Sequence, residues 1–464
     1  MVFGWKKDIK RVHYQLSRSM VYPYATKEQL TSGKPYHFAE YPPDEFLRDY
    51  RQSREVITFS PFDEIKNWNE EKIRKEGKSL IKEVEEGKSV ETSRALEILY
   101  HILKSKNLDL YGQAEHLLKR YRRKVELKKL KQQHQGKELK NTGSEAGVFE
   151  YVWLGACLGI HYLHSQNLQS LSTLLKVNDE VIAKAGKLNK KEQSVAALSL
   201  DSEKIGILKL KENLQIRPLK ERLQKRKLKA NNPTTIQNLG MIVQDKLRSR
   251  AYLQSLLEAG FKPEKVLILE QKEARNDALE KPIKNNKFFR DTEKVQETCQ
   301  RVRIPYEVIA AGDFNMPQVV EALQKEKGKY YVFSGSGILQ EEILSTGKKL
   351  IHVHPGIVPQ YRGSTCFLYS LLAEGKCGAT AFFMDAGIDT GKVILQREFL
   401  PPDEETDIDR VYDNYIRAQV LVEVVTKLVK EGTLEGREQK EEGETYYVIH
   451  PVLRVIAGVY YRGS

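Results

Sequence analysis

The stretch Leu350–Gln396 of this 464-residue chain, LIHVHPGIVPQYRGSTCFLYSLLAEGKCGATAFFMDAGIDTGKVILQ, decides the fold. Its first residues, Leu350–His354, are rich in β-branched side chains and stop at a Pro-Gly pair, which is typical of a buried strand that runs into a loop. Side chains alternate along a strand, so we expect His352 and His354 on the same side. The apolar segment Phe367–Ala373 is long enough for about two helical turns.

A second strand-like run, Ala379–Met384, leads into an acidic loop. The loop is DAGIDTG, residues 385–391, and glycines bracket its carboxylates Asp385 and Asp389. Two histidines and an acidic loop that meet at strand ends are typical of a functional site rather than of a core.

Upstream of this stretch, strand and helix patterns alternate. Strands are predicted at Gly240–Val243, Lys265–Leu269, Tyr306–Ile309 and Tyr330–Phe333, and helices at Arg250–Leu257, Thr292–Val302 and Pro317–Gln324. This alternation predicts an α/β domain with a doubly wound, mostly parallel sheet. Ligands bind such sheets at the carboxyl ends of the strands, where the two histidines and the acidic loop fall.

The first 200 or so residues show helical periodicity instead. Apolar residues recur at helical spacing in Ser89–Leu118, and two further helices are predicted at Phe149–Leu163 and Leu168–Leu175. We interpret this region as a partner-binding or homo-oligomerisation module. The predicted organisation is a mainly helical N-terminal module at 1–203, a basic linker at 204–233, the α/β domain at 234–402, and a C-terminal helix and tail at 403–464 that pack on the α/β domain.

The formal net charge of +13 is a moderate excess for this length. It is compatible with an acidic ligand such as a phosphate, a folate polyglutamate or RNA, but requires none. The basic run Arg120–Lys140 is interpreted as a solvated helix face, because Tyr121 is its only interleaved aromatic residue. Nucleic acid is therefore not an expected partner.

Cysteine spacing and hydropathy bear on the compartment. The four cysteines show no CxxC spacing, which favours free thiols in a reducing cytoplasm over a disulfide framework or a zinc knuckle. The most apolar segment, Tyr151–Ile160, is too short for a membrane span, which takes about 20 residues. The N-terminus has no apolar core long enough for a signal peptide. We expect a soluble, cytoplasmic protein.

Three short motifs in Leu350–Gln396 resemble those of the formyltransferase family, whose members act on glycinamide ribonucleotide, methionyl-tRNA or amino sugars. The family pattern is a strand ending Asn-x-His-Pro-Ser, then Leu-Pro-x-x-x-Gly, then a loop Leu-Asp-x-Gly. The counterparts here are His354-Pro355-Gly356, Val358-Pro359-Gln-Tyr-Arg-Gly363 and Ile388-Asp389-Thr390-Gly391, in the same order and with the same spacing. One departure is serious, because His352 takes the place of the Asn.

The resemblance implies a fold of formyltransferase type, with 10-formyltetrahydrofolate as co-substrate and an amine as acceptor. It also implies that the loop after Tyr330–Phe333 holds the pterin of the folate, because glycines there permit a close backbone approach. Taken alone, this Gly-Ser-Gly segment is also compatible with a simple tight turn. The implied folate-binding residues are Ser334, Gly335, Ser336, Gly337, Ile338, Asp385 and Gly387.

The acceptor side departs from the family. Many relatives have a glycine-rich turn after the first strand, whereas this chain has QDKLRSR at 244–250. Lys246, Arg248 and Arg250 fit two interpretations, an anion site for the acceptor or side chains that face solvent. The segment after Pro402 is too short for the extra β-barrel domain by which methionyl-tRNA formyltransferases grip tRNA. An amino-sugar acceptor is the resulting prediction.

The resemblance assigns the catalytic roles to three residues. His354 is the candidate for moving the proton, since a histidine works near neutral pH, and Asp389 would orient it. In the family the Asn supplies a donor to the oxyanion. We hypothesise that His352 replaces it by N–H donation, more strongly as an imidazolium, so that the histidines and the carboxylate titrate together.

Two other interpretations of the same residues stay open. His352, His354 and Asp389 could be the three ligands of a metal with an open coordination position, in a metal-dependent hydrolase or transferase. Alternatively, the domain could be catalytically inactive and bind folate or a protein partner, because a fold does not guarantee its function.

Overall fold

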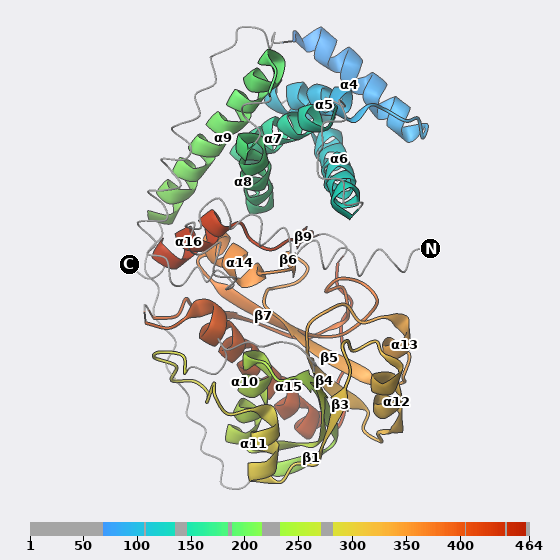
Figure 1. The fold of residues 1–464 in the computed structure, drawn as a ribbon, viewed down its shortest axis with the longest axis vertical. Helices are drawn as coiled ribbons and strands as arrows, with labels where there is room; N and C mark the ends of the chain where they lie inside the picture. The colour runs from blue at the N-terminus through green and yellow to red at the C-terminus, as the bar shows by residue number, and fades with distance from the viewer. Residues whose placement is uncertain are drawn as a thin grey trace. The chain divides into compact units, whose positions relative to one another are not determined.

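The computed structural model describes residues 68–105, 108–134, 146–183, 188–215, 233–270, 282–403, 405–440 and 443–460, which form two compact units (Figure 1). Among these residues, a helical unit contains 68–215 together with His450–Ile456. An α/β unit contains 233–449 and resumes at Ala457. Most of the expected basic linker, the end of the basic run Arg120–Lys140 and residues 1–67 lie outside the described residues.

The helical unit confirms the helical periodicity of the N-terminal region. Its helices are α4 (Glu70–Glu85), α5 (Thr92–Ser105), α6 (Leu108–His134), α7 (Ala146–Ser165), α8 (Leu168–Ala183), α9 (Lys190–Gln215) and the first part of α16 (Pro451–Tyr460). Helix α9 continues past residue 203, where the sequence had suggested that the linker begins. The segment His450–Ile456 belongs to this unit rather than to the α/β unit.

Helix α7 is the central helix of this unit and contacts α5, α8 and α9. It is apolar on nearly all sides, because neighbouring helices surround it. Glycines let α9 approach closely: a Cβ at Gly155 would lie 2.3 Å from Ser199 Oγ. A Cβ at Gly159 would lie 2.4 Å from Ser202 Cβ. None of the described helices is long and apolar enough to cross a membrane.

The α/β unit is built on a seven-stranded sheet with strand order β3-β2-β1-β4-β5-β7-β8. Neighbours among β1 to β5 pair in parallel, and β7 pairs antiparallel with both β5 and β8. The sheet is therefore mostly parallel, as predicted. Its strands are β1 (Thr234–Gln244), β2 (Phe261–Glu270), β3 (Tyr306–Ala310), β4 (Tyr330–Ser334), β5 (Lys349–His354), β7 (Cys377–Phe383) and β8 (Val393–Phe399).

A separate two-stranded sheet pairs β6 (Tyr361–Gly363) in parallel with β9 (Glu444–Tyr446). These strands and β8 were not predicted. The unit's helices are α10 (Leu247–Glu258), α11 (Val295–Val302), α12 (Pro317–Lys325), α13 (Glu341–Leu344), α14 (Cys366–Glu374), a π-helical turn at Ile408–Tyr412 and α15 (Asp413–Glu431).

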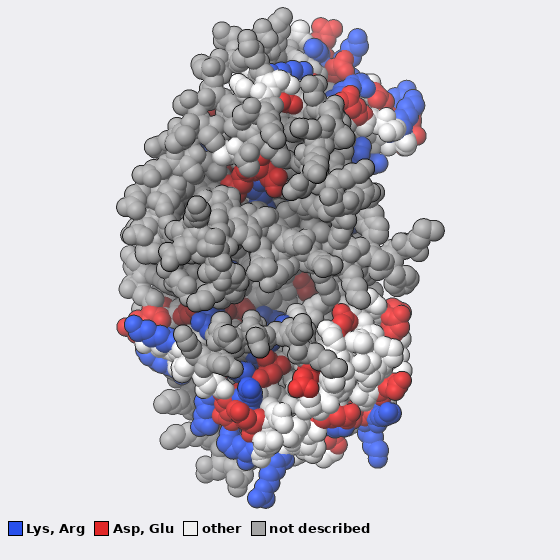
Figure 2. All heavy atoms as spheres, in the orientation of Figure 1, with Lys and Arg blue, Asp and Glu red and all other residues white. Residues whose placement is uncertain are grey.

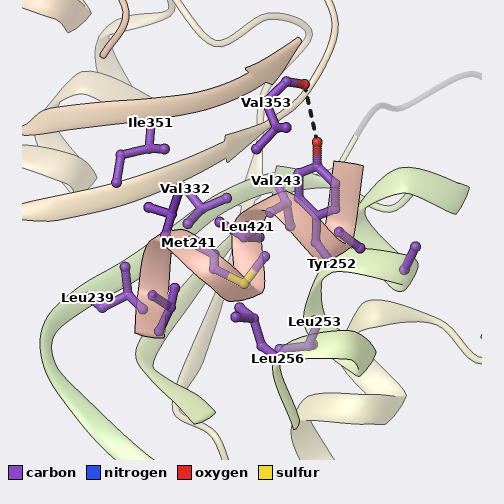
Figure 3. Packing of buried hydrophobic residues seen from close by; sticks show 14 of the residues in the cluster. Leu239, Met241, Val243, Tyr252, Leu253, Leu256, Val332, Ile351, Val353 and Leu421 are labelled. Atoms are coloured by element: carbon purple, nitrogen blue, oxygen red, sulfur yellow. Dashed lines mark hydrogen bonds between the residues drawn. The ribbon is translucent and has the colours of Figure 1, made fainter. Parts of the chain in front are cut away.

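Each face of the large sheet carries its own core, which explains why its strands are apolar throughout. Met241 and Val243 of β1 pack with Leu253 of α10 and Leu421 of α15, as Figure 3 shows. Ile242, between them in sequence, faces the opposite core with residues of α12 and α13. Helices therefore cover both faces, as the predicted doubly wound arrangement requires.

The strand order places the candidate site. From β1 the chain proceeds outward to β2 and β3, and then returns to add β4 and β5 on the other side. Parallel sheets bind ligands at such a reversal, outside the carboxyl ends of the strands. Here those ends are Gln244 of β1, Ser334 of β4 and His354 of β5.

Candidate active site

Three of the predicted site residues converge at the end of β5. His352, His354 and Asp389 each present a nitrogen or oxygen atom, and these atoms all lie within 4.8 Å of one another. The strand period brings the two histidines to one side, as predicted from the sequence. Asp389 comes from the loop that follows β7, and β7 is hydrogen-bonded to β5.

His354 is fully surrounded, with 1% of its surface exposed, and both ring nitrogens have partners. Nε2 lies 2.8 Å from the carbonyl oxygen of Tyr361, and Nδ1 lies 3.2 Å from Asp389 Oδ2. A carbonyl oxygen and a carboxylate can only accept hydrogen bonds. Each of these two acceptors therefore faces a ring nitrogen of His354 that can donate to it, and the carboxylate of Asp389 lies directly against the imidazole.

Asp389 is held from two sides. Its Oδ2 accepts a hydrogen bond of 2.8 Å from the backbone N–H of Gly363, in addition to the contact with His354. Burial alone would raise the pKa of the Asp389 carboxyl, but His354, His352 and the Gly363 N–H favour the charged form. The net effect is a pKa well below the usual value, so Asp389 is a carboxylate throughout the neutral range.

His352 lies in a positively charged environment. Burial, followed by the charges of Arg248 and Arg417, lowers its pKa well below the usual value. This direction argues against the imidazolium form considered from the sequence and favours a neutral ring. Nδ1 is buried and has no hydrogen-bond partner among the described residues. A neutral imidazole can still donate one N–H, as the amide of an Asn would.

The carbonyl of Val353, between the two histidines, is fixed by residues that sequence reasoning missed. It accepts hydrogen bonds from the Tyr252 hydroxyl at 3.3 Å, which Figure 3 shows, and from Arg417 Nε at 2.8 Å. Arg417 also pairs with Asp413 at 3.1 Å, and both side chains are buried. The one local signal was this oppositely charged pair at i, i+4, within the segment 403–464 where the sequence predicts a helix.

The loop after β4 is braced by the segment 244–250. The Ser334 hydroxyl lies 2.8 Å from Ser249 Oγ and accepts from Arg248 Nε at 3.2 Å. Arg248 also donates to the carbonyl of Gly335. A Cβ at Gly335 would lie 2.1 Å from the Phe314 ring, so only glycine fits there.

The basic residues of this segment have distinct partners. Arg250 is buried and bonds Asp245 through Nε at 2.9 Å and Nη2 at 2.8 Å, so it is structural. Lys246 Nζ donates to the Ser336 hydroxyl at 2.9 Å. Burial and the neighbouring Arg248 lower the pKa of Lys246 to about 8. Neither of the two interpretations from the sequence, an anion site or a solvated face, describes Arg250.

The other residues implied for folate binding shape their own loops. Gly337 has a left-handed φ of 106°, and the carbonyl of Ile338 accepts from Asn315 at 3.1 Å. Asp385 Oδ1 accepts from the Gly387 N–H at 3.0 Å and from the Thr390 hydroxyl at 2.8 Å. These bonds set loop conformation, and folate contact remains a prediction for each residue.

Known proteins match a defined part of this chain. The family model described as Formyl transferase matches residues 248–425. The methionyl-tRNA formyltransferase of Caldanaerobacter subterraneus subsp. tengcongensis is 34% identical over 137 residues, which are 28% of this chain and 44% of that protein. The cytosolic 10-formyltetrahydrofolate dehydrogenase of Mus musculus is 32% identical over 138 residues, which are 28% of this chain and 15% of that protein.

Among solved structures, glycinamide ribonucleotide transformylase 1 from Symbiobacterium toebii aligns with 44% of this chain and 92% of its own, at 18% identity and a TM-score of 0.32. The chain spans less than half the length of the two curated relatives. The family match contains His352, His354 and Asp389, whereas the helical unit and the residues after 425 lie outside it.

Proposed function

We propose, from the premise that residues 248–425 belong to the formyl transferase family, that this chain transfers a formyl group from 10-formyltetrahydrofolate to an amine. The observation that carries the proposal is the buried contact between His354 Nδ1 and Asp389 Oδ2, 3.2 Å apart at the carboxyl end of β5. The glycine-containing loop after β4 is held by Arg248 and packs against Phe314, whose ring would lie 2.1 Å from a Cβ at Gly335, so the loop backbone is fixed in place for the pterin contact that the resemblance implies.

The contact between His354 and Asp389 offers groups that formyl transfer needs. The attacking amine must lose a proton, negative charge develops on the formyl oxygen, and the folate nitrogen must take up a proton as its bond to the formyl carbon breaks. Asp389 uses Oδ2 for both described bonds of its carboxylate, so Oδ1 is the oxygen that would meet the amine. An N–H of the His354 ring and an N–H of neutral His352 would stabilise the oxyanion. His354 releases a ring proton only by giving up its bond to Tyr361 or to Asp389.

For the acceptor we propose an amino sugar. Support comes from the segment 244–250, where Arg250 is paired with Asp245 and Arg248 is bonded to the loop after β4, so both guanidinium groups already have partners within the domain. On the face that Figure 2 shows, basic and acidic side chains intermix over the described part of the α/β unit, which gives no support to a nucleic-acid acceptor there.

The test is turnover with purified full-length protein. We expect release of tetrahydrofolate from 10-formyltetrahydrofolate in the presence of one member of a panel of amino sugars and other amines. His354→Ala and Asp389→Asn should each lower kcat by about 10²- to 10⁴-fold, the usual contribution of a positioned acid or base. His116→Ala, at an exposed histidine of the helical unit, is the matched control and should leave kcat unchanged.

A domain that binds folate but gives no turnover with any acceptor would contradict the proposal and support the inactive interpretation. The metal interpretation has the 4.8 Å cluster in its favour. Against it stand the charges of Arg248 and Arg417 beside His352, which repel a divalent cation. Stoichiometric metal in the purified protein, with turnover lost on chelation, would support it.

A further inference from the structure

Gln439 lies in the segment between α15 and β9, outside the family match, and its side-chain amide joins two loops of the site. Nε2 donates to the carbonyl of Asp389 at 2.9 Å and to the carbonyl of Gly391 at 2.7 Å. Oε1 accepts from Arg362 Nη2 at 2.9 Å and from Arg362 Nε at 3.2 Å. Since guanidinium only donates and carbonyls only accept, this orientation of the amide is the one that satisfies every partner.

The Gln439 side-chain amide bonds to the loop backbone at Asp389 and Gly391, where the chain has an uncommon conformation. Asp389 has a left-handed φ of 55°, a conformation that residues other than glycine adopt infrequently. Gly391 passes so close to β7 that a Cβ there would lie 1.7 Å from the carbonyl oxygen of Phe383. The carbonyls of Asp389 and Gly391 both accept a hydrogen bond from Gln439. These two bonds fix the direction in which the Asp389 side chain leaves the loop.

The other half of the amide acts on the same carboxylate through β6. Arg362 donates a hydrogen bond to Gln439 Oε1. The next residue, Gly363, donates its N–H to Asp389 Oδ2 at 2.8 Å. The pairing of β6 with β9 and the bond from the Ser364 N–H to the Tyr446 carbonyl, 2.8 Å long, tie β6 to the same C-terminal segment. Gln439 therefore bridges the backbone of Asp389 and the strand that holds its carboxylate.

We propose that Gln439 is a positioning residue for Asp389, and that the segment after α15 is thus part of the machinery for formyl transfer. The inference rests on the proposed function for its kinetic consequence, though not for its structural one. Gln439 acts by keeping Asp389 in line with His354. A displacement of about 1 Å in a reacting group lowers turnover by roughly 10²-fold, so loss of the bridge should be visible in kcat.

Two substitutions separate the halves of the amide. Gln439→Glu keeps an acceptor for Arg362 but removes the donor to the Asp389 and Gly391 carbonyls. Gln439→Met removes both without adding charge. Arg437→Met is the matched control. Arg437 lies in the same segment, two residues before Gln439, but its side chain donates to Gln396 and not to the loop at Asp389.

We expect both Gln439 variants to lower kcat by about 10- to 100-fold with an unchanged KM for 10-formyltetrahydrofolate, and Arg437→Met to have little effect. In an Asp389→Asn background, Gln439→Met should add almost nothing, because both changes remove the same contribution. If the effects of Gln439→Met and Asp389→Asn on kcat are fully additive, the inference is overturned. It is also overturned if Gln439→Glu lowers kcat and Gln439→Met does not, because that result would indicate charge repulsion.

Amide hydrogen exchange gives a readout that does not depend on turnover. Both Gln439 variants should raise exchange in the loop 385–391 relative to wild type and to Arg437→Met. If the wild-type protein transfers no formyl group, the proposed function fails, while raised exchange still supports the positioning role. Unchanged exchange in this loop would overturn it whatever the activity.

Discussion

At the scale of single residues, the environment of His352 determines what that side chain can contribute. Its ring is partly buried, lies beside His354, and has two guanidinium groups near enough to disfavour its protonation. A neutral imidazole differs little from an amide as a hydrogen-bond donor. The substitution of His for the family's Asn is therefore smaller in chemical terms than it looks in the sequence.

We predict that His352→Asn keeps turnover within about 10-fold of wild type, whereas His352→Ala lowers it by about 10²- to 10³-fold, the usual loss on removing an oxyanion donor. The measurement is kcat/KM for both variants across pH 5 to 9. Because neutral His352 takes up no proton in this range, the acid limb of the profile should be the same for wild type and His352→Asn. A shifted acid limb would mean that His352 titrates.

Among single residues, the sequence identified those site residues that lie in short motifs or follow the strand period. The strand period placed His352 and His354 together, and the motif Ile388-Asp389-Thr390-Gly391 supplied their carboxylate. It did not identify Gln439 or Arg417, because their contacts, to Asp389 and to the Val353 carbonyl, lie 50 and 64 positions away in sequence. Nothing in the local pattern around Gln439 distinguishes it from an ordinary surface glutamine.

At the scale of elements, α5 carries a titratable group inside the helical unit. His101 is 3% exposed, stacks on Trp68 with ring centroids 4.4 Å apart, and its buried Nε2 has no partner among the described residues. Burial, followed by the charges of Lys104 and Lys72, lowers its pKa from 6.5 to about 4. The folded protein therefore prefers the neutral ring more strongly than the unfolded chain does.

This difference predicts a pH dependence of stability. The contribution of neutral His101 is fully present above pH 6.5 and is lost as the pH falls towards 4, by about 3 kcal/mol in total at 1.36 kcal/mol per unit. His101→Phe keeps a stacking ring and should remove this part of the dependence. Urea unfolding of the two proteins at pH 7 and pH 4.5, followed by tryptophan fluorescence, measures it. Parallel losses of stability in both proteins would contradict the assignment.

Elements with a strong apolar period were predictable, and short ones were not. The strands β3, β4 and β5 match their predicted runs, whereas β1 and β2 start at Thr234 and Phe261 rather than at Gly240 and Lys265, and the pairing of these two early parts is separated from the rest by an irregularity between Ile236 and Gly240. The three-residue strands β6 and β9 are too short to show alternation, and they pair across a separation of about eighty residues. Only tertiary contacts specify such a pair.

At the scale of the whole molecule, the helical unit is completed by a segment from the far end of the chain. His450 is fully buried, its Nε2 lies 2.8 Å from Asp179 Oδ2, and its backbone N–H donates to the Ser172 hydroxyl at 3.1 Å. Val452 N–H donates to His450 Nδ1 at 3.2 Å, so the ring proton is on Nε2 and points to the carboxylate.

We predict that His450→Leu destabilises the helical unit by about 3 kcal/mol or more, because it takes the imidazole away from a buried carboxylate. The double variant Asp179→Leu/His450→Leu should regain much of that loss. Hydrogen exchange of α8, which carries Ser172 and Asp179, is the measurement in the full-length protein. The exchange of β4 and β5 in the α/β unit serves as the internal control, and an equal loss of protection there would contradict a local effect.

The joining of His450–Ile456 to helices from before residue 216 has a consequence for biosynthesis. In order of translation, the α/β unit is an insert within the helical unit, and the helical unit lacks its last piece until the whole insert has left the ribosome. Until then nascent α8 lacks the partner that Ser172 and Asp179 have in His450. A product cut short just before His450 would retain every residue of the proposed catalytic site but would lack the segment that completes the helical unit, so we expect the survival of the protein to depend on synthesis through Ile456.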